Sequence, residues 1–581
     1  MTGNDVLQMT LYMAAVLLLV KPLGAYMAKV FAERPNRVTR FGAPVERALY
    51  RLCGIRADEE MTWQRYAMAM LLFNLAGLLV LYLLQRVQGW LPLNPQQLGA
   101  VAPGLAMNTA ISFASNTNWQ AYAGESTMSY LTDMLGLTVQ NFLSAATGIA
   151  ILLAVIRGFT RRSARTVGNF WVDTTRATLY VLLPLSLLLA LALVSQGVIQ
   201  NLHPYVEAHL LQSTTQTVGN ATTPLSTQTL PMGPAASQVA IKQLGTNGGG
   251  FFNANSAHPF ENPNAWTNLL EIWLILVTGF ALPIAFGHMI GRKHDGVALF
   301  AAMAVILGVA LFASYAAEAA NNPILVHAGV AAAPGNMVGK EVRFGIVQST
   351  SFNVAATATS CGAVNSFLDS YTPLGGLVSL FLMQLGEVAP GGVGSGFYGM
   401  ILFTLLAVFV AGLMVGRTPE YLGKRIESHE VKLTVLAVLI QTAFILLGTG
   451  GALLTKSGLG SLAAAGPHGL TEMLYGWTSA TENNGSAFAG LAANTPLLNY
   501  GLGIAMLAGR FAVMIPVLAI GGSLAAKPIL PRSAGSFPTD GLLFVSLLIG
   551  VVVIMGGLQF MPADTLGPLA EHTLMQSGKL F

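Results

Sequence analysis

The sequence carries little charge. Only 9% of its 581 residues are charged, whereas about 25% is usual for a soluble globular protein. Hydrophobic residues make up 53% of the chain, and the mean hydropathy is +0.60. A set of soluble domains would need far more charged surface than this chain supplies. The composition therefore indicates a protein that lies largely in lipid.

Motifs for catalysis and for disulfides are also missing. The two cysteines, Cys53 and Cys361, are too few for a disulfide scaffold or a four-cysteine metal site. The sequence has no Asp-Lys-Thr-Gly phosphorylation motif. The segment from Gly448 to Ser457 lacks the glycine that precedes the lysine of a phosphate-binding loop. We therefore expect no catalytic site and no bound nucleotide in this chain.

The sequence also gives little support for an enzyme of another class. No His/Asp/Glu cluster with metal-ligand spacing lies within the apolar runs. His258, His327 and His468 are scattered in outer regions and are expected to be solvated. No basic loop is long enough to hold a nucleotide-binding domain, so any energy source must be in another chain.

Ten apolar runs are long enough to cross a bilayer as helices, which takes roughly 20 residues each. They lie at approximately 6–31, 66–86, 127–156, 177–199, 266–290, 297–318, 374–416, 433–454, 497–523 and 541–560. The first run is too long for a signal peptide and is expected to remain as a helix. The seventh is broken by Gly386, Pro390 and a glycine cluster, so we expect two half-helices there.

Positive charge is concentrated in alternate loops. These loops carry Arg34, Arg37, Arg40, Arg47, Arg51, Arg56, Arg157, Arg161, Arg162, Arg165, Arg292, Lys293, Arg417, Lys424, Arg425, Lys432, Lys527 and Arg532. The opposite loops carry only Lys242, Lys340, Arg343, Lys456 and Lys579. The basic loops are therefore expected in the cytoplasm, with both termini outside. The outer segment 200–236, rich in Thr, Gln and Ser, is expected to be a solvated loop without a core of its own.

Four outer connections share one layout. Each has a short apolar segment, at about 106–114, 237–245, 349–358 and 471–480, followed by a polar string and a new spanning run. The four strings are Ser115–Gln120, Thr246–Phe252, Thr359–Asn365 and Thr481–Ala487. This repetition predicts an all-α polytopic membrane protein with four span–pore helix–string–span repeats around one pore, plus one extra helix at each end. The expected boundaries are 1–62 for the first helix and its basic loop, 63–165, 166–291, 292–425 and 426–526 for the repeats, and 527–581 for the last helix and outer tail.

The strings have the chemistry of an ion filter. Non-helical backbone is tolerated at membrane depth only where it lines a cavity or is buried in protein. Backbone carbonyls from four segments can replace the hydration shell of a potassium ion, and glycine permits the close approach that this requires. One such string alone would most often be a tight turn. Four strings on one side, each between two spans, favour four pore loops.

The strings resemble those of the potassium-binding A subunit of the bacterial Kdp potassium-transporting ATPases. Thr246–Phe252, Thr359–Asn365 and Thr481–Ala487 look like the second to fourth filter segments of that family, and Asn116–Gln120 looks like the first. The resemblance extends over essentially the full chain. It implies potassium-binding residues at Asn116, Thr117, Gln120, Thr246, Asn247, Gly248, Ser360, Cys361, Gly362, Asn483, Asn484 and Gly485.

The resemblance also implies partners. In this family a B subunit, a P-type ATPase, hydrolyses ATP, and small C and F subunits complete a complex in the bacterial inner membrane. Potassium is then the transported ion, bound from outside. The alternative is a Trk/Ktr-type channel subunit gated by a soluble nucleotide-binding partner. Those relatives share the four-repeat plan but more commonly show a lone filter glycine per repeat.

Charged residues in or at the edge of the apolar runs point to a gate. A lone charge near the bilayer centre costs at least about 2.5 kcal/mol, so it should face a partner or a cavity. Glu387 lies in a glycine-rich stretch, 386–396, that resembles the loop beneath the filter in the family. The expected gate and inner-pore residues are Glu387, Gly391, Gly392, Gly394, Arg417 and Arg510. Arg510 is a candidate partner for Glu387, whereas for Arg417 simple extension to the inner surface is an equal alternative. We expect potassium to leave the axis sideways, toward the ATPase.

Overall fold

The computed structural model describes residues 3–32, 37–218, 221–320, 322–330, 335–531 and 537–579. Within these residues, ten helical stretches are long and apolar enough to cross a membrane, which confirms the ten predicted spans. The basic residues Arg34 and Arg532 lie outside the described residues.

The first two repeats follow the predicted order. In the first, the spans are α3 (Trp63–Val87) and the π-helical η2 (Thr132–Thr138) with α6 (Val139–Thr160), and the short helix is α4 (Pro103–Ala114). In the second, the first span is formed by α7 (Phe170–Arg176), η3 (Ala177–Leu182) and α8 (Leu183–Ser195). The short helix is α9 (Ala235–Leu244), and the second span is α10 (Ala265–Met289).

The third and fourth repeats have the same order. The third contains α11 (Lys293–Ala319), the short helix α13 (Gly345–Thr357), α14 (Pro373–Gln384) and α15 (Ser395–Met414). Residues 385–394 are non-helical, so the seventh run is split into two half-helices as predicted. The fourth contains α16 (Ser428–Leu453), the short helix α18 (Gly466–Glu482), α19 (Pro496–Leu507), η6 (Ala508–Ala512) and α20 (Val513–Ala526).

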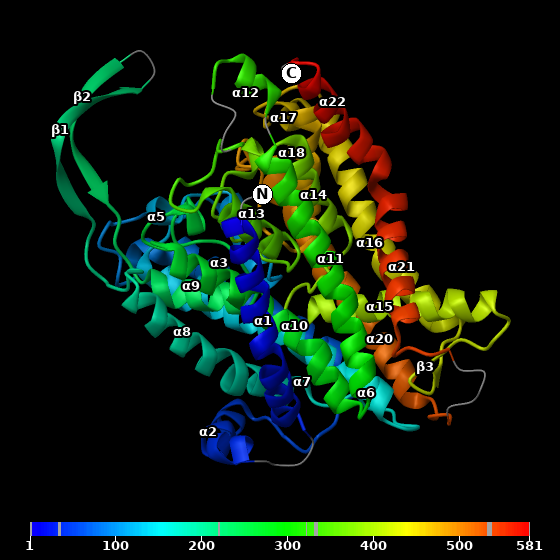
Figure 1. Ribbon diagram of the computed structural model, residues 1–581. Coiled ribbons are helices and arrows are strands. Elements are labelled where there is room, and N and C mark those ends of the chain that lie inside the picture. The colour runs from blue at the N-terminus through cyan, green and yellow to red at the C-terminus, as the bar shows by residue number, and fades with distance from the viewer. Residues whose placement is uncertain are drawn as a thin grey trace.

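One helix flanks the repeats at each end. The first, α1 (Gly3–Val30), packs along α10, where Trp273 donates from its indole nitrogen to the carbonyl of Ala15 at 3.1 Å. A Cβ at Gly24 would lie 2.7 Å from the carbonyl oxygen of Ala281, so glycine is needed for this close approach. The last stretch is α21 (Leu542–Asp564), η7 (Thr565–Leu569) and α22 (Ala570–Gln576). The N- and C-terminal ends lie toward the top of Figure 1, away from the basic loops at the bottom.

Short elements connect these helices. They are η1 (Gln88–Trp90), α5 (Gly124–Thr127), η4 (Asn255–Ala257), α12 (Pro323–His327), η5 (Leu368–Ser370), α17 (Lys456–Leu459), and the strands β3 (Glu420–Tyr421) and β4 (Lys424–Arg425). Strands β3 and β4 pair with each other near the C-terminal end of α15.

The outer segment 200–236 is not a loop, and this prediction is wrong. It contains an antiparallel hairpin of β1 (Val206–Val218) and β2 (Ala221–Leu230), which projects from the helical body in Figure 1. The many threonines explain the strands, because β-branched residues suit an extended chain. Most described side chains of the hairpin are exposed, so the expectation that it lacks a core of its own is correct.

The basic segment after α1 is a helix, not a loop. Helix α2 (Arg37–Cys53) is amphipathic and lies at the bottom of Figure 1. Its buried Glu46 accepts hydrogen bonds from Tyr180 at 2.8 Å and from Arg176 at 2.9 Å. These contacts fasten α2 to the fourth span, a tertiary interaction that local sequence cannot reveal.

Candidate ion-binding site

All four short helices end with the same backbone turn. Each is followed by a residue with left-handed backbone angles, namely Asn116 (φ 69°), Thr246 (φ 48°), Ser360 (φ 51°) and Asn483 (φ 65°). In each case the next backbone N–H donates to the carbonyl five residues earlier: Thr117 to Ser112 (3.0 Å), Asn247 to Lys242 (2.8 Å), Cys361 to Ala356 (3.2 Å) and Asn484 to Ser479 (2.8 Å). This is the Schellman pattern, in which glycine is usual. A side chain here costs roughly 1–2 kcal/mol, so contacts elsewhere must hold each turn in place.

The shared turn aligns the four strings residue by residue. The residue two positions after the left-handed residue is glycine in three strings, at Gly248, Gly362 and Gly485. In the first string this residue is Asn118. Asn118 also has positive φ (54°), and its amide nitrogen donates to Asn141 at 2.7 Å. Asn118 was not among the residues predicted for the first string, which the family resemblance gave as Asn116, Thr117 and Gln120. Alignment on the ends of the four short helices would have found it.

The first and second strings are joined by side-chain amides. Asn116 donates to the carbonyl of Thr246 at 3.1 Å and accepts from the side chain of Asn247 at 2.5 Å. Farther along, Gln120 donates to the carbonyl of Gly250 at 3.0 Å and accepts from the backbone N–H of Gly250 at 2.8 Å. The predicted residues Asn116, Gln120, Thr246 and Asn247 are therefore in one network.

The other strings close the ring. The N–H of Gly362 donates to the carbonyl of Asn247 at 3.3 Å, which joins the second and third strings. A Cβ on Gly362 would lie 2.8 Å from the carbonyl carbon of Gly485, so the third and fourth strings are in contact. Asn483 donates to the hydroxyl of Thr117 at 3.0 Å, although the two are 366 residues apart. All four strings thus meet, and the predicted filter residues lie in or beside this ring.

A cavity borders the ring on the side of the connections that follow the strings. Its volume is about 550 Å³, and its lining includes residues of all four strings, among them Asn118, Gly249, Gly362 and Gly485. The residues of the ring itself are buried, with Thr117, Asn247, Cys361 and Asn484 fully so. The arrangement is a wide entrance with a mixed polar and apolar lining, next to a narrow ring of amides, hydroxyls and carbonyls.

The loop 385–394 lies directly against the strings on the other side. The N–H of Gly391 donates to the carbonyl of Ala358 at 2.9 Å, and the N–H of Val393 donates to the hydroxyl of Thr246 at 2.8 Å. A Cβ on Gly392 would lie 3.0 Å from the Cβ of Ser360, and the backbone of Gly394 (φ 86°) packs on Gly148 of α6.

Glu387 reaches two strings from this loop. Its carboxylate accepts from the side-chain amide of Asn484 at 2.7 Å and from the hydroxyl of Ser360. The structure thus brings Glu387 together with Gly391, Gly392 and Gly394, as expected for a group of residues beneath the strings.

Of the two arginines of the predicted gate, Arg510 lies near the loop and Arg417 does not. Arg510 is buried in η6 and donates to the carbonyl of Ser144 at 3.1 Å. Within the described part of the chain it forms no ion pair with Glu387. Arg417 lies beyond the end of α15, is exposed, and is not part of the group around Glu387. For Arg417 the structure fits the alternative in which the side chain extends to the surface.

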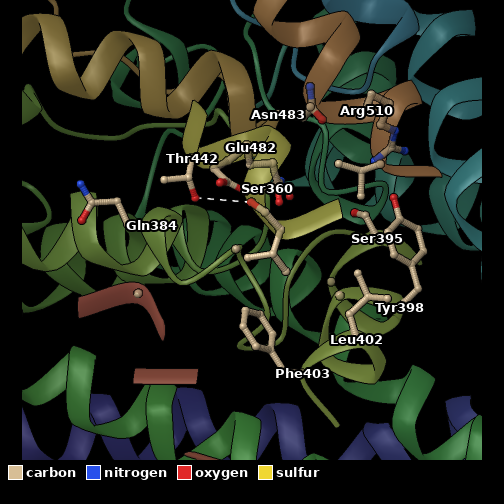
Figure 2. A pocket seen from close by; sticks show the side chains of 18 of the residues that line it. Ser360, Gln384, Ser395, Tyr398, Leu402, Phe403, Thr442, Glu482, Asn483 and Arg510 are labelled. Atoms are coloured by element: carbon tan, nitrogen blue, oxygen red, sulfur yellow. Dashed lines mark hydrogen bonds between the residues drawn. The ribbon is translucent and has the colours of Figure 1, made fainter. Parts of the chain in front are cut away.

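A second, narrow cavity lies beside the loop (Figure 2). Its volume is about 50 Å³, and its lining combines Ser360 and Asn483 with Glu482, Arg510 and residues of α14, α15 and α16. Gln559 of α21 lies at its edge and accepts from Thr442 at 2.8 Å. The lining mixes polar side chains with apolar ones, such as Leu402 and Phe403. The cavity therefore lies between the third and fourth strings and the helices α14, α15, α16 and α21.

His468 is not solvated, contrary to expectation. At the outer end of α18 its two ring nitrogens lie 3.1 Å from Asp369 and 2.9 Å from Glu571. Burial lowers the pKa of His468, but the hydrogen bonds to the two carboxylates outweigh it and raise the pKa to about 10. His468 and Asp369, together with Glu472, form the group of metal-ligating side chains found among the described residues. Because both ring nitrogens already have carboxylate partners, the group works as an ion-pair network that holds α22 against α18.

Comparison with known proteins agrees with the four-repeat architecture. Residues 10–573 match the profile of the family described as "Potassium-transporting ATPase A subunit". The chain is 56% identical over 581 residues to the "Potassium-transporting ATPase potassium-binding subunit" of Mesorhizobium japonicum, with 100% of both chains covered. It is also 56% identical to the protein of that name from Sorangium cellulosum, with 99% of this chain and 100% of that chain covered.

A solved structure shares the fold. The potassium transporter TrkH from Vibrio parahaemolyticus aligns with a TM-score of 0.51 and 13% sequence identity, covering 88% of this chain and 98% of that chain. This likeness concerns the fold alone. Because the family profile spans nearly the whole sequence and the curated relatives align end to end, the chain belongs to the family of potassium-transporting ATPase A subunits.

Proposed function

We propose that this chain is the potassium-binding and potassium-translocating subunit of an ATP-driven potassium import complex. The observation that carries the proposal is the closed ring of four strings. Each string begins at the C-terminal end of a short helix, where the partial negative charge of the helix favours a cation. Backbone and side-chain oxygens of the ring supply the ligands that replace a hydration shell.

Apart from Gln120, the proposed potassium ligands come from equivalent positions in the four repeats. They are Asn116, Thr117, Gln120, Thr246, Asn247, Gly248, Ser360, Cys361, Gly362, Asn483, Asn484 and Gly485, and we add Asn118 because it is equivalent to Gly248. Potassium is the transported substrate. The repeats that contribute these ligands are proposed to be 63–165, 166–291, 292–425 and 426–526.

The ion path is proposed to turn sideways below the ring. A pump cannot keep a straight open pore, because ions would run back down their gradient. The loop 385–394 lies against the second and third strings, and the lining of the narrow cavity includes residues of the third and fourth strings and Gln559 of α21. We propose that potassium leaves through this cavity toward the ATPase subunit.

The proposed complex contains a B subunit of the P-type ATPase class and small C and F subunits. The names of the curated relatives support membership of a potassium-transporting ATPase. The basic loops are proposed to face the cytoplasm of a bacterial cell, with both termini outside the inner membrane. The Trk/Ktr-type alternative is favoured only by fold likeness, which does not identify a partner.

Co-purification tests the choice between these two functions. The chain, tagged at its exposed C-terminal end and purified from native membranes in mild detergent, should bring down a membrane-bound P-type ATPase, identified by mass spectrometry. Recovery of a soluble nucleotide-binding protein, with no P-type ATPase, would instead support the channel alternative. The same tag on an unrelated membrane protein provides the background.

Substitution of Gly248 tests the ring as the potassium site. A Cβ at this position would overlap the backbone of Gly362, and φ is 79°, so Gly248→Asp must displace two strings. We expect potassium affinity to fall at least about tenfold, equal to 1.4 kcal/mol, with weaker discrimination against other cations. Potassium titration of uptake measures this. Gly99→Asp is the control, because Gly99 is exposed and a Cβ there meets no neighbour. Wild-type affinity and selectivity in Gly248→Asp would show that the second string is not part of a filter.

Deletion of residues 391–394 tests the barrier. Without them the loop cannot reach its contacts with Ala358 and Thr246, so passive potassium leak should rise in proteoliposomes without nucleotide. The control removes residues 210–213 from the hairpin, where strand pairing is already irregular. If the loop deletion folds and retains its partner but leaks no more than the control, the loop is not the barrier.

A further inference from the structure

A buried ion pair lies behind the second string. Lys242 is in the last turn of α9 and Glu261 follows the string, and both side chains are 0% exposed. The ammonium nitrogen lies 2.5 Å from a carboxylate oxygen of Glu261. Charged side chains are rarely buried so completely, and each must be paired and hydrogen-bonded to remain there.

Both members of the pair form hydrogen bonds with the backbone of the second string. Besides Glu261, the ammonium of Lys242 donates to the carbonyl of Gly249 at 2.8 Å and to the side chain of Asn255 at 2.9 Å, so its three donors have three acceptors. The other carboxylate oxygen of Glu261 accepts from the N–H of Phe252 at 2.8 Å. The carbonyl oxygen of Lys242 accepts from the N–H groups of Asn247 and Gly248.

The first repeat has a neutral counterpart at the same position. The shared helix turn makes Ser112 equivalent to Lys242, and Trp119 equivalent to Gly249. The hydroxyl of Ser112 donates to the carbonyl of Trp119 at 2.9 Å, seven residues ahead, as Lys242 does to Gly249. In the third and fourth repeats this position is Ala356 and Ser479. Among the four equivalent positions, only Lys242 is charged.

We propose that the Lys242–Glu261 pair is a positioning element that sets the cation selectivity of the second string. This inference rests on the proposed ion site. Lys242 holds the carbonyl of Gly249 toward α9 and keeps it from coordinating the ion, so the second string offers a defined set of oxygens. Glu261 cancels the charge of Lys242, which would otherwise repel a cation in the ring through surroundings that screen it poorly.

The two members of the pair therefore have different predicted effects. Glu261→Gln leaves the ammonium uncompensated, so potassium affinity should fall at least about tenfold. Lys242→Met frees the Gly249 carbonyl, so the ratio of potassium to sodium affinity should fall by about tenfold. Its loss of potassium affinity should be smaller than that of Glu261→Gln. The double variant Lys242→Met/Glu261→Gln removes both charges of the pair. It should recover much of the affinity lost in Glu261→Gln while remaining as unselective as Lys242→Met.

A second buried ion pair provides the control. Lys340 and Glu318 are also fully buried, with 2.6 Å between nitrogen and oxygen. Glu318 accepts hydrogen bonds from Asn336 and Thr372, which lie outside the strings. Lys340→Met/Glu318→Gln therefore removes a comparable pair without releasing a string carbonyl. Its potassium affinity and its potassium-to-sodium ratio should match the wild type.

The experiment is calorimetric titration of the purified full-length chain with potassium chloride and with sodium chloride. Thermal unfolding verifies that each variant is folded. If Glu261→Gln or Lys242→Met does not fold, the potassium-to-sodium ratio is measured on the double variant instead. A wild-type ratio in the folded double variant overturns the proposal, as does an equal loss in the Lys340/Glu318 control. If the wild-type chain itself does not bind potassium, the proposed function fails, and the ion pair is then only structural.

Discussion

The hydrogen bond that closes each short helix determines the geometry of the whole centre. It takes the next residues out of the helix and begins a non-helical string in all four repeats. The left-handed residue at each turn is Asn, Thr or Ser, where glycine would be less strained. The strain persists because the strings hold one another: Asn116 binds Thr246 and Asn247, and Asn483 binds Thr117. The turns and the ring therefore stabilise each other, and neither is expected to survive alone.

Around this ring, each string is held from a different side. Glu387 forms hydrogen bonds with the third and fourth strings from the loop 385–394. Lys242 and Glu261 form hydrogen bonds with the backbone of the second string. The first string relies on neutral groups, such as the hydroxyl of Ser112 and the amide of Gln120. The four repeats thus share one backbone but differ in charge. Such asymmetry is compatible with the proposed barrier and the proposed lateral exit on one side of the ring.

The features that the sequence could predict are those that depend on local composition. The ten spans follow from apolar length, and the break at 385–394 follows from Gly386, Pro390 and the glycines after them. The four strings could be found because their pattern repeats between spans. Asn118 could not be found by searching for glycine, because its equivalence to Gly248 lies in the backbone turn and not in residue type.

Contacts between distant residues were beyond prediction. Arg510 was a candidate partner of Glu387. It lies near the loop, but its hydrogen bond goes to the carbonyl of Ser144, and Glu387 binds Asn484 and Ser360 of the strings. His468 was expected in solvent but lies between Asp369 and Glu571, which come from segments 99 and 103 residues away. The pairing of Lys242 with Glu261 gave no signal in the sequence, because nothing in the local pattern shows that both side chains are buried.

The most direct test of the account is to locate the ion. Rubidium has the charge of potassium and a similar size, and its anomalous scattering identifies it in a crystal. In crystals of the chain grown with rubidium in place of potassium, the strongest anomalous peak should lie inside the ring, with oxygens from all four strings as its nearest neighbours. A peak outside the ring, or an ion that contacts fewer than three strings, would contradict the central claim that the four strings form one potassium site.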